Sequence, residues 1–236
     1  MKVDQIVINA MVYTVNDSFT IAESFAVKDG KFLAVGTNEE ISAKYTSDQI
    51  SDLDGMVVYP GFIDAHCHFY GYGMNLMQYA DLAGIANQES IYLKLQEHLA
   101  KAGGEWLLGR GWDQNLWPEK EFPDNQRLNA LFPDVPVYLI RIDGHAAWCN
   151  SKALELAGIT ATTKIDGGEV LLKNGKPIGV LVDNAKDLVF NQIPSPSVAL
   201  QTKALQTAQN NCFAVGLTSV TDCGLQLETI MLMDSL

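Results

Sequence analysis

The stretch PGFIDAHCHF at residues 60–69 decides how this chain is interpreted. It overlaps a nearly continuous apolar run, Val57–Ala65, which is typical of a strand buried on both faces, as in a barrel. Successive side chains on a strand point to opposite faces. His66 and His68 are therefore expected to point the same way, and Cys67 the opposite way.

Two imidazoles placed in this way, at the carboxyl end of a buried strand, can reach one divalent metal ion. Imidazole nitrogen suits zinc and similar metals, and a barrel carries its catalytic groups at the carboxyl ends of its strands. A metal ion there can polarise a carbonyl group and activate water. The alternative is two structural histidines that only make hydrogen bonds. The apolar strand favours the first reading, so we expect a divalent metal, preferably zinc, at His66 and His68.

The residues before this stretch are β-rich. Asp29-Gly30 lies between two short apolar runs and is typical of a two-residue hairpin. Thr37 and Glu40 have the spacing of a capping box, which predicts a short helix. We interpret residues 1–56 as a small β-sandwich segment.

Residues 57–236 alternate between strand and helix patterns, which favours βα units with parallel strands. Asn174-Gly175 marks an inserted hairpin. Buried-type strands are expected at 57–65, 137–142 and 217–220, and helices at 88–102, at 151–157 and from about Pro196 to before Gly216. A closed (β/α)8 barrel needs eight strands and about 250 residues. The fold class is therefore α/β, with the first part of a TIM-like barrel, incomplete here, in residues 57–236.

Composition excludes several classes of protein. The 236 residues are 47% hydrophobic and carry a formal net charge of -12, with a pI near 4.6. Such an acidic chain is a poor partner for nucleic acid or an anionic membrane. Its four cysteines form no CxxC pair, so we expect reduced thiols that are mostly buried. No signal-peptide pattern and no membrane-length apolar run is present, and we expect a soluble cytoplasmic protein.

Three motifs in the chain carry a family resemblance. They are PGFIDAHCHF at 60–69, GRGWD at 109–113 and DGHAAWCNSKAL at 143–154. In this order they resemble the metal-dependent amidohydrolase superfamily. The similarity is to its YtcJ-like branch (amidohydrolase 3), which includes N-substituted formamide deformylase-like enzymes. The resemblance covers nearly the whole chain.

The resemblance implies a hydrolase with a β-sandwich beside a (β/α)8 barrel, of which this chain is the N-terminal portion. His66 and His68 match the first two metal ligands of the family. The other ligands lie on later strands, so we expect the metal site to be incomplete and this chain alone to be inactive.

Other candidate residues follow the later strands. His145, a catalytic candidate, lies where the family lines its site; it could bind substrate or polarise a carbonyl, or it could be a loop histidine bonded to backbone. Arg110, Trp112 and Asp113 are substrate-binding candidates in a Gly-flanked loop, with packing as the alternative for Trp112. The remaining histidine, His98, is expected at the surface of a helix.

Two carboxylates complete the set of catalytic candidates. Asp183 occupies a position where the family pattern has Glu, and its shorter side chain weakens any inherited role. Asp222 ends the third expected barrel strand.

The leading hypothesis is a metal-dependent hydrolase that acts on carbon–nitrogen bonds of a small-molecule amide or formamide. Deamination or cyclic-amide hydrolysis by the same chemistry is one alternative, and a non-catalytic truncated module is another. Three barrel strands leave open sheet edges, which favour pairing with another chain, so association into homo-oligomers is expected.

Overall fold

A computed structural model describes the backbone of residues 1–236 and every side chain except that of Ala102. The chain forms two compact units: residues 1–64 with 215–219, and residues 65–214 with 220–236. The boundary expected at residues 56/57 falls inside the first unit. Each unit is described by itself.

The first unit contains two small sheets and one helix. The four-stranded sheet has the order β5-β4-β1-β6, and the three-stranded sheet the order β3-β2-β7. The elements are β1 (Gln5–Ile8), β2 (Met11–Tyr13), β3 (Ile21–Ala22), β4 (Ser24–Lys28), β5 (Lys31–Gly36), α1 (Asn38–Lys44), β6 (Ile50–Asp52) and β7 (Val57–Val58). Val7, Val12 and Phe25 bring side chains from both sheets into one buried cluster.

Two local predictions for this unit are confirmed. Asp29 and Gly30 both have positive φ, 52° and 70°, as the tight turn between β4 and β5 requires. The hydroxyl of Thr37 accepts a hydrogen bond from the amide of Glu40, whose side chain accepts one from the amide of Thr37, so the capping box opens α1.

The prediction of a single strand at Val57–Ala65 was wrong. The chain forms β7, which pairs with β2, and then β8 (Phe62–Cys67), which pairs with β15 (Leu217–Asp222). Pro60 lies between them and has no N–H to donate to a ladder, so the two strands are separate. Ile63 is 73% exposed, so in this structure β8 is not buried on both faces.

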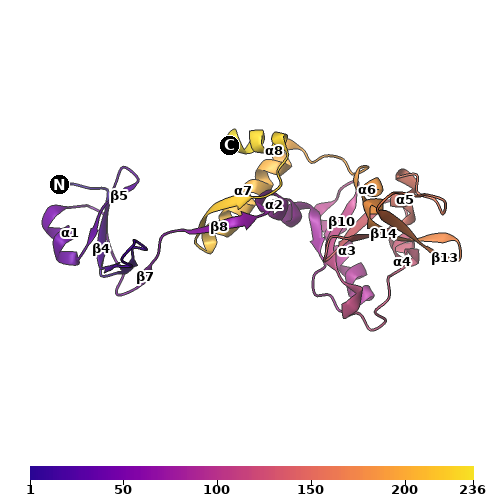
Figure 1. Cartoon of the computed structure of the whole chain (residues 1–236), viewed down its shortest axis with the longest axis horizontal. Coiled ribbons are helices and arrows are strands. Elements are labelled where there is room, and N and C mark those ends of the chain that lie inside the picture. The colour runs from indigo at the N-terminus through magenta and orange to yellow at the C-terminus, as the bar shows by residue number, and fades with distance from the viewer. The chain divides into compact units, whose positions relative to one another are not determined.

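A six-stranded sheet dominates the second unit (Figure 1), in the order β13-β14-β12-β11-β10-β9. Its strands are β9 (Tyr79–Asp81), β10 (Leu107–Trp112), β11 (Val137–Arg141), β12 (Ala146–Cys149), β13 (Gly168–Lys173) and β14 (Lys176–Asp183). β9, β10 and β11 are parallel, whereas β12 is antiparallel to both β11 and β14. The purely parallel arrangement we expected is therefore mixed. The carboxyl ends of β10, β11 and β14 and the start of β12 lie at the same edge of this sheet.

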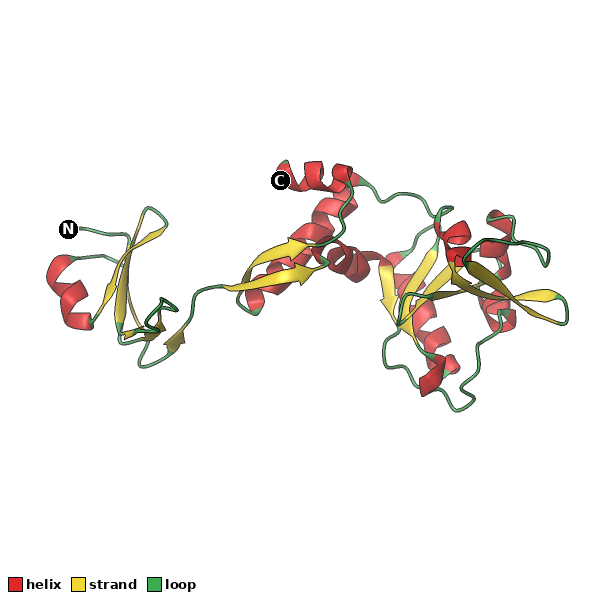
Figure 2. Cartoon of the chain, viewed as in Figure 1, coloured by secondary structure: helices red, strands yellow, loops and turns green.

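Both faces of the six-stranded sheet are covered. Leu107 packs in a cluster with Ile91 and Leu95 of α3, and its neighbour Leu108 packs in a second cluster with Leu154 of α5. These clusters follow from the alternation of side chains along β10. The helices of this layer are α3 (Gln88–Ala102), α4 (Gln126–Leu131), α5 (Ser151–Leu156) and α6 (Asn184–Phe190), with the short η1 (Gln114–Leu116). They appear red around the sheet in Figure 2.

The remaining helices are α2 (Phe69–Gln78), α7 (Val198–Ala214) and α8 (Leu227–Asp234). Pro196 lies two residues before α7 rather than in its first turn; the hydroxyl of Ser197 accepts a hydrogen bond from the amide of Leu200 instead. No helix in the described part of the chain is long and apolar enough to cross a bilayer.

The described strands form four sheets, none of them closed on itself. The fold is mixed α/β, and the incomplete barrel stays a prediction.

Candidate functional site

The end of β8 brings two imidazoles together. The ring centroids of His66 and His68 lie 5.7 Å apart with their planes at 82°, and both residues are exposed. Two imidazoles bound to one tetrahedral zinc ion at about 2.0–2.1 Å would have centroids roughly 5 Å apart. The separation of the rings is therefore close to that of two ligands of one metal ion, and neutral imidazole is the right type of donor for zinc.

The end of β15 lies beside this pair. The amide of Cys223 donates a 3.1 Å hydrogen bond to the carbonyl of Cys67. Oδ2 of Asp222 accepts a 3.0 Å hydrogen bond from the amide of Tyr70, in the first turn of α2. Asp222, a catalytic candidate, is thus close to the paired histidines, where it caps the helix that follows them.

Among the described residues, two imidazoles are the metal-ligand candidates grouped at the end of β8. Among the residues that the structure describes, no three His, Cys, Asp or Glu side chains are grouped so that they could hold a metal ion. Two protein ligands alone hold zinc weakly, since structural sites use four and catalytic sites three.

The expectation of mostly buried cysteines was wrong. Only Cys149 is buried, Cys67 and Cys212 are half-buried, and Cys223 is exposed. Cys223 follows the end of β15, and its backbone amide, not its sulfur atom, makes the contact with Cys67 next to the histidine motif.

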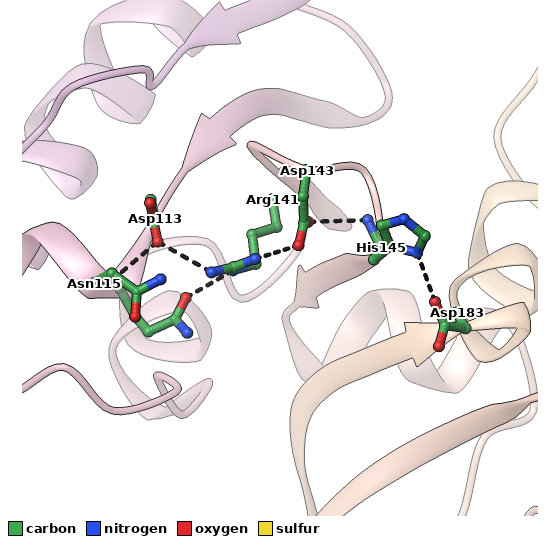
Figure 3. Close-up of polar contacts among 7 residues, drawn as sticks. Asp113, Asn115, Arg141, Asp143, His145 and Asp183 are labelled. Carbon is green, nitrogen blue, oxygen red and sulfur yellow. Dashed lines mark hydrogen bonds and ion pairs between the residues drawn. The ribbon is translucent and has the colours of Figure 1, made fainter.

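A second group of polar side chains lies at the carboxyl-end edge of the six-stranded sheet (Figure 3). Arg141, at the end of β11, donates from Nη2 to Oδ1 of Asp113 over 3.1 Å, from Nε to Gln114 over 2.8 Å, and from Nη1 to Asp143. Its side chain is only 14% exposed. A guanidinium group in this position needs such partners, because an unpaired buried charge is costly.

His145 continues this network. Its amide donates a 3.0 Å hydrogen bond to Oδ1 of Asp143, and its Nδ1 lies 2.9 Å from Oδ1 of Asp183 (Figure 3). The amide of Asp183 in turn donates a 2.7 Å hydrogen bond to the carbonyl of His145. Two predicted catalytic residues that are 38 positions apart are therefore in direct contact, and Arg141 and Asp143 connect them to the predicted substrate-binding residue Asp113.

Asp183 has a strained backbone. Its φ of 49° and ψ of -126° are close to those of the first central residue of a type II′ turn, where glycine predominates. A non-glycine residue in such a conformation costs of order 1–3 kcal/mol. The contact with His145 is exposed, with side-chain accessibilities of 75% and 50%, and exposed pairs contribute about 0–1 kcal/mol. The contact therefore stabilises the folded chain by less than the backbone strain at Asp183 costs.

Trp112 and Arg110 lie on β10, not in the loop we expected. The Trp112 side chain is fully buried; its Nε1 donates a 2.8 Å hydrogen bond to the carbonyl of Leu139, and its ring packs on Trp117 and Trp148. This position favours the packing alternative for Trp112. A substrate-binding role for either residue stays a prediction.

Arg110 is half-buried near the turn that carries His145. A Cβ atom added to Gly144 would lie 4.0 Å from its Nη2. Burial raises the pKa of Tyr79, and the positive charge of Arg110 partly opposes that rise. Arg110 is therefore placed at the same edge as Asp113, and its charge also acts on the half-buried phenol of Tyr79.

Arg141 and Asp143 were missed as site residues. A signal was present, because Arg141 is a lone charge in the apolar run VYLIRI at 137–142 and so had to find partners. The identity of those partners depends on how the strands pair, which the run does not reveal.

Comparison with known proteins gives a consistent result. The sequence profile described as "Amidohydrolase family" matches residues 49–231. The chain is 35% identical over 88% of its length to the putative amidohydrolase YtcJ of Bacillus subtilis (strain 168), and 30% identical over 93% to N-substituted formamide deformylase of Arthrobacter pascens. An uncharacterized metal-dependent hydrolase from Pyrococcus horikoshii has a similar structure, with a TM-score of 0.72 and 25% identity over 98% of this chain.

These similarities cover only part of each relative. The chain spans 40% of the Bacillus protein, 42% of the Arthrobacter protein and 45% of the Pyrococcus chain. It therefore corresponds to less than half the length of the proteins it resembles.

Proposed function

Because this chain belongs to the amidohydrolase family, we propose that it contributes His66 and His68 to the divalent metal site of a hydrolase that cleaves carbon–nitrogen bonds in small non-peptide amides or formamides. The observation that carries this proposal is the pair of imidazoles at the end of β8, 5.7 Å apart and facing solvent. Similarity to a formamide deformylase over 93% of the chain supports the substrate class.

A bound zinc ion would supply Lewis-acid polarisation of the carbonyl group and an activated water molecule. His66 and His68 would hold the ion through neutral nitrogens, and Asp222 would fix the first turn of α2 directly after His68. The edge that carries Asp113, His145 and Asp183 provides acceptors for donor groups of a substrate. Arg141 is already paired on both sides, so it orients Asp113 and Asp143.

The metal assignment can be tested by equilibrium dialysis of the chain against excess zinc, with metal content measured by elemental analysis. The wild-type chain should bind about one zinc ion weakly, and the His66→Ala, His68→Ala double variant should lose this binding. His98→Ala is the matched control. The ring of His98 is hydrogen-bonded to the carbonyl of Gln78, so this variant also removes an imidazole but leaves His66 and His68 in place. Equal zinc binding by the folded double variant would refute the assignment.

The substrate assignment needs a separate experiment. We expect the zinc-loaded chain itself to release no formate from N-substituted formamides, because its described residues group only two metal ligands. A chimera in which this chain replaces the matching part of the Arthrobacter deformylase should release formate in a metal-dependent way. A folded, metal-loaded chimera that deaminates or opens cyclic amides, but leaves formamides intact, would favour the alternative hydrolase reading.

A further inference from the structure

His145 and Asp183 form an arrangement that stability does not explain. Asp183 contacts the same residue twice, through its amide on the His145 carbonyl and through its carboxylate on Nδ1 of the ring. Its backbone stays in a conformation that favours glycine. Strain of this kind persists where the surrounding structure holds it in place, and it is concentrated at functional sites.

The contact determines the chemistry of the imidazole. An ionised carboxylate only accepts hydrogen bonds, so the nitrogen that faces Asp183 must carry a proton. In a neutral ring Nε2 is then unprotonated and has its lone pair available. Figure 3 shows this second ring nitrogen on the side of the ring away from Asp183. An unconstrained imidazole in water favours the opposite tautomer, with the proton on Nε2.

The other charged groups of this edge do not compete for the ring. Oδ1 of Asp143 accepts the His145 amide, not a ring nitrogen. Arg141 is paired with Asp113 and Asp143. The side chain of His145 is 75% exposed, so Nε2 can be reached from solvent at the edge where β10, β11 and β14 end.

We propose that Asp183 is a positioning residue, which holds His145 as the Nδ1–H tautomer and presents the unprotonated Nε2 as an acceptor for an N–H or O–H group of the ligand. The proposal rests on the proposed function only for the nature of that ligand, an amide-type substrate. A carboxylate that fixes the tautomer and the orientation of a histidine ring in this way is a recurring arrangement in proteins.

The test is a nitrogen-15 NMR measurement of the imidazole tautomers in the intact chain, at a pH that keeps the rings neutral. His145 can be assigned through the loss of its signals in His145→Gln. In the wild type, His145 should be predominantly Nδ1–H. Asp183→Gly removes the carboxylate but suits the positive φ, so the chain should fold and His145 should change to mainly Nε2–H.

Two further variants separate positioning from a structural role. Asp183→Asn keeps an acceptor oxygen and should retain the Nδ1–H tautomer. Asp187→Asn removes an equally exposed carboxylate from the following helix, where it pairs with Lys186, and should leave the His145 tautomer unchanged. A wild-type His145 that is mainly Nε2–H, or an Asp183→Gly variant with the wild-type tautomer, would overturn the proposal. Neither result would bear on zinc binding at His66 and His68, so a failure here is distinguishable from a failure of the proposed function.

Discussion

The amide of Tyr70 and the carboxylate of Asp222 are joined by a 3.0 Å hydrogen bond, although the two residues lie 152 positions apart. The bond attaches the end of β15 to the first turn of α2. An acceptor at this place satisfies one of the amides that a helix leaves unpaired at its start, and its negative charge interacts favourably with the helix dipole. Asp222 thus has a structural role next to the two histidines.

Removing this acceptor should destabilise the second unit. Asp222→Ala is expected to lower the free energy of unfolding by about 1 kcal/mol, the usual cost of losing a helix cap. Asp222→Asn keeps an oxygen acceptor and should lose only a few tenths of a kcal/mol, mostly the charge term. Urea unfolding followed by tryptophan fluorescence measures both. If Ala and Asn are equally destabilising, the hydrogen bond is not the source of the effect.

Local features were well predicted from the sequence because short-range rules determine them. The Asp29-Gly30 and Asn174-Gly175 hairpins, the capping box at Thr37 and the helix at 88–102 all occur as expected. The strand β12 was missed because DGHAAWC begins with turn residues and is too short to show a period. It is recognisable only as the antiparallel neighbour of both β11 and β14.

The candidate site was predicted in part. The same-face argument for His66 and His68 assumed that both lie on one strand, but β8 ends at Cys67 and His68 is the N-cap of α2. Their rings are nevertheless close, with centroids 5.7 Å apart, and their role as metal ligands stays a prediction. The contact between His145 and Asp183 depends on β12 lying beside β14. The sequence therefore indicated both residues as candidates, but it did not predict that they are in contact. The burial of Trp112 could not be predicted from the sequence either, because a tryptophan that follows a glycine is compatible with a substrate pocket and with a core position.

The burial of Trp112 leads to a second prediction. Trp112→Ala should lower the free energy of unfolding by about 3–5 kcal/mol, as expected for removal of a large core side chain. Trp112→Phe keeps an aromatic ring but removes the indole hydrogen bond to the Leu139 carbonyl, at a cost of about 1 kcal/mol. Leu116→Ala is a suitable control, because that side chain is 49% exposed.

The measurement is urea unfolding monitored by the fluorescence of the remaining tryptophans. A change below about 1 kcal/mol for Trp112→Ala would contradict the core assignment and would restore the pocket interpretation of this residue.

The last prediction concerns alkaline pH. Burial raises the pKa of Tyr92 to about 12, and the negative charges of Asp124 and Glu89 add to the rise while Arg127 opposes it. Burial also raises the pKa of the Tyr138 phenol and of the Cys149 thiol well above their ordinary values. These groups stay protonated in the folded chain at a pH where the unfolded chain loses their protons. The unfolded state then binds fewer protons, so the free energy of unfolding falls as the pH rises.

The loss should begin near pH 8.5 to 9, where an exposed thiol ionises, and become steeper above pH 10, where exposed tyrosines ionise. For Tyr92 the relevant window is pH 10 to about 12, because above it the folded chain also ionises this group. Tyr92→Phe should therefore reduce the slope in this window while changing stability little at pH 8, where only the hydrogen bond to Gln88 is lost. Urea unfolding at half-unit pH steps from 8 to 11.5 measures the slope, and identical slopes above pH 10 in the wild type and the variant would show that the Tyr92 phenol is not protected from ionisation by the fold.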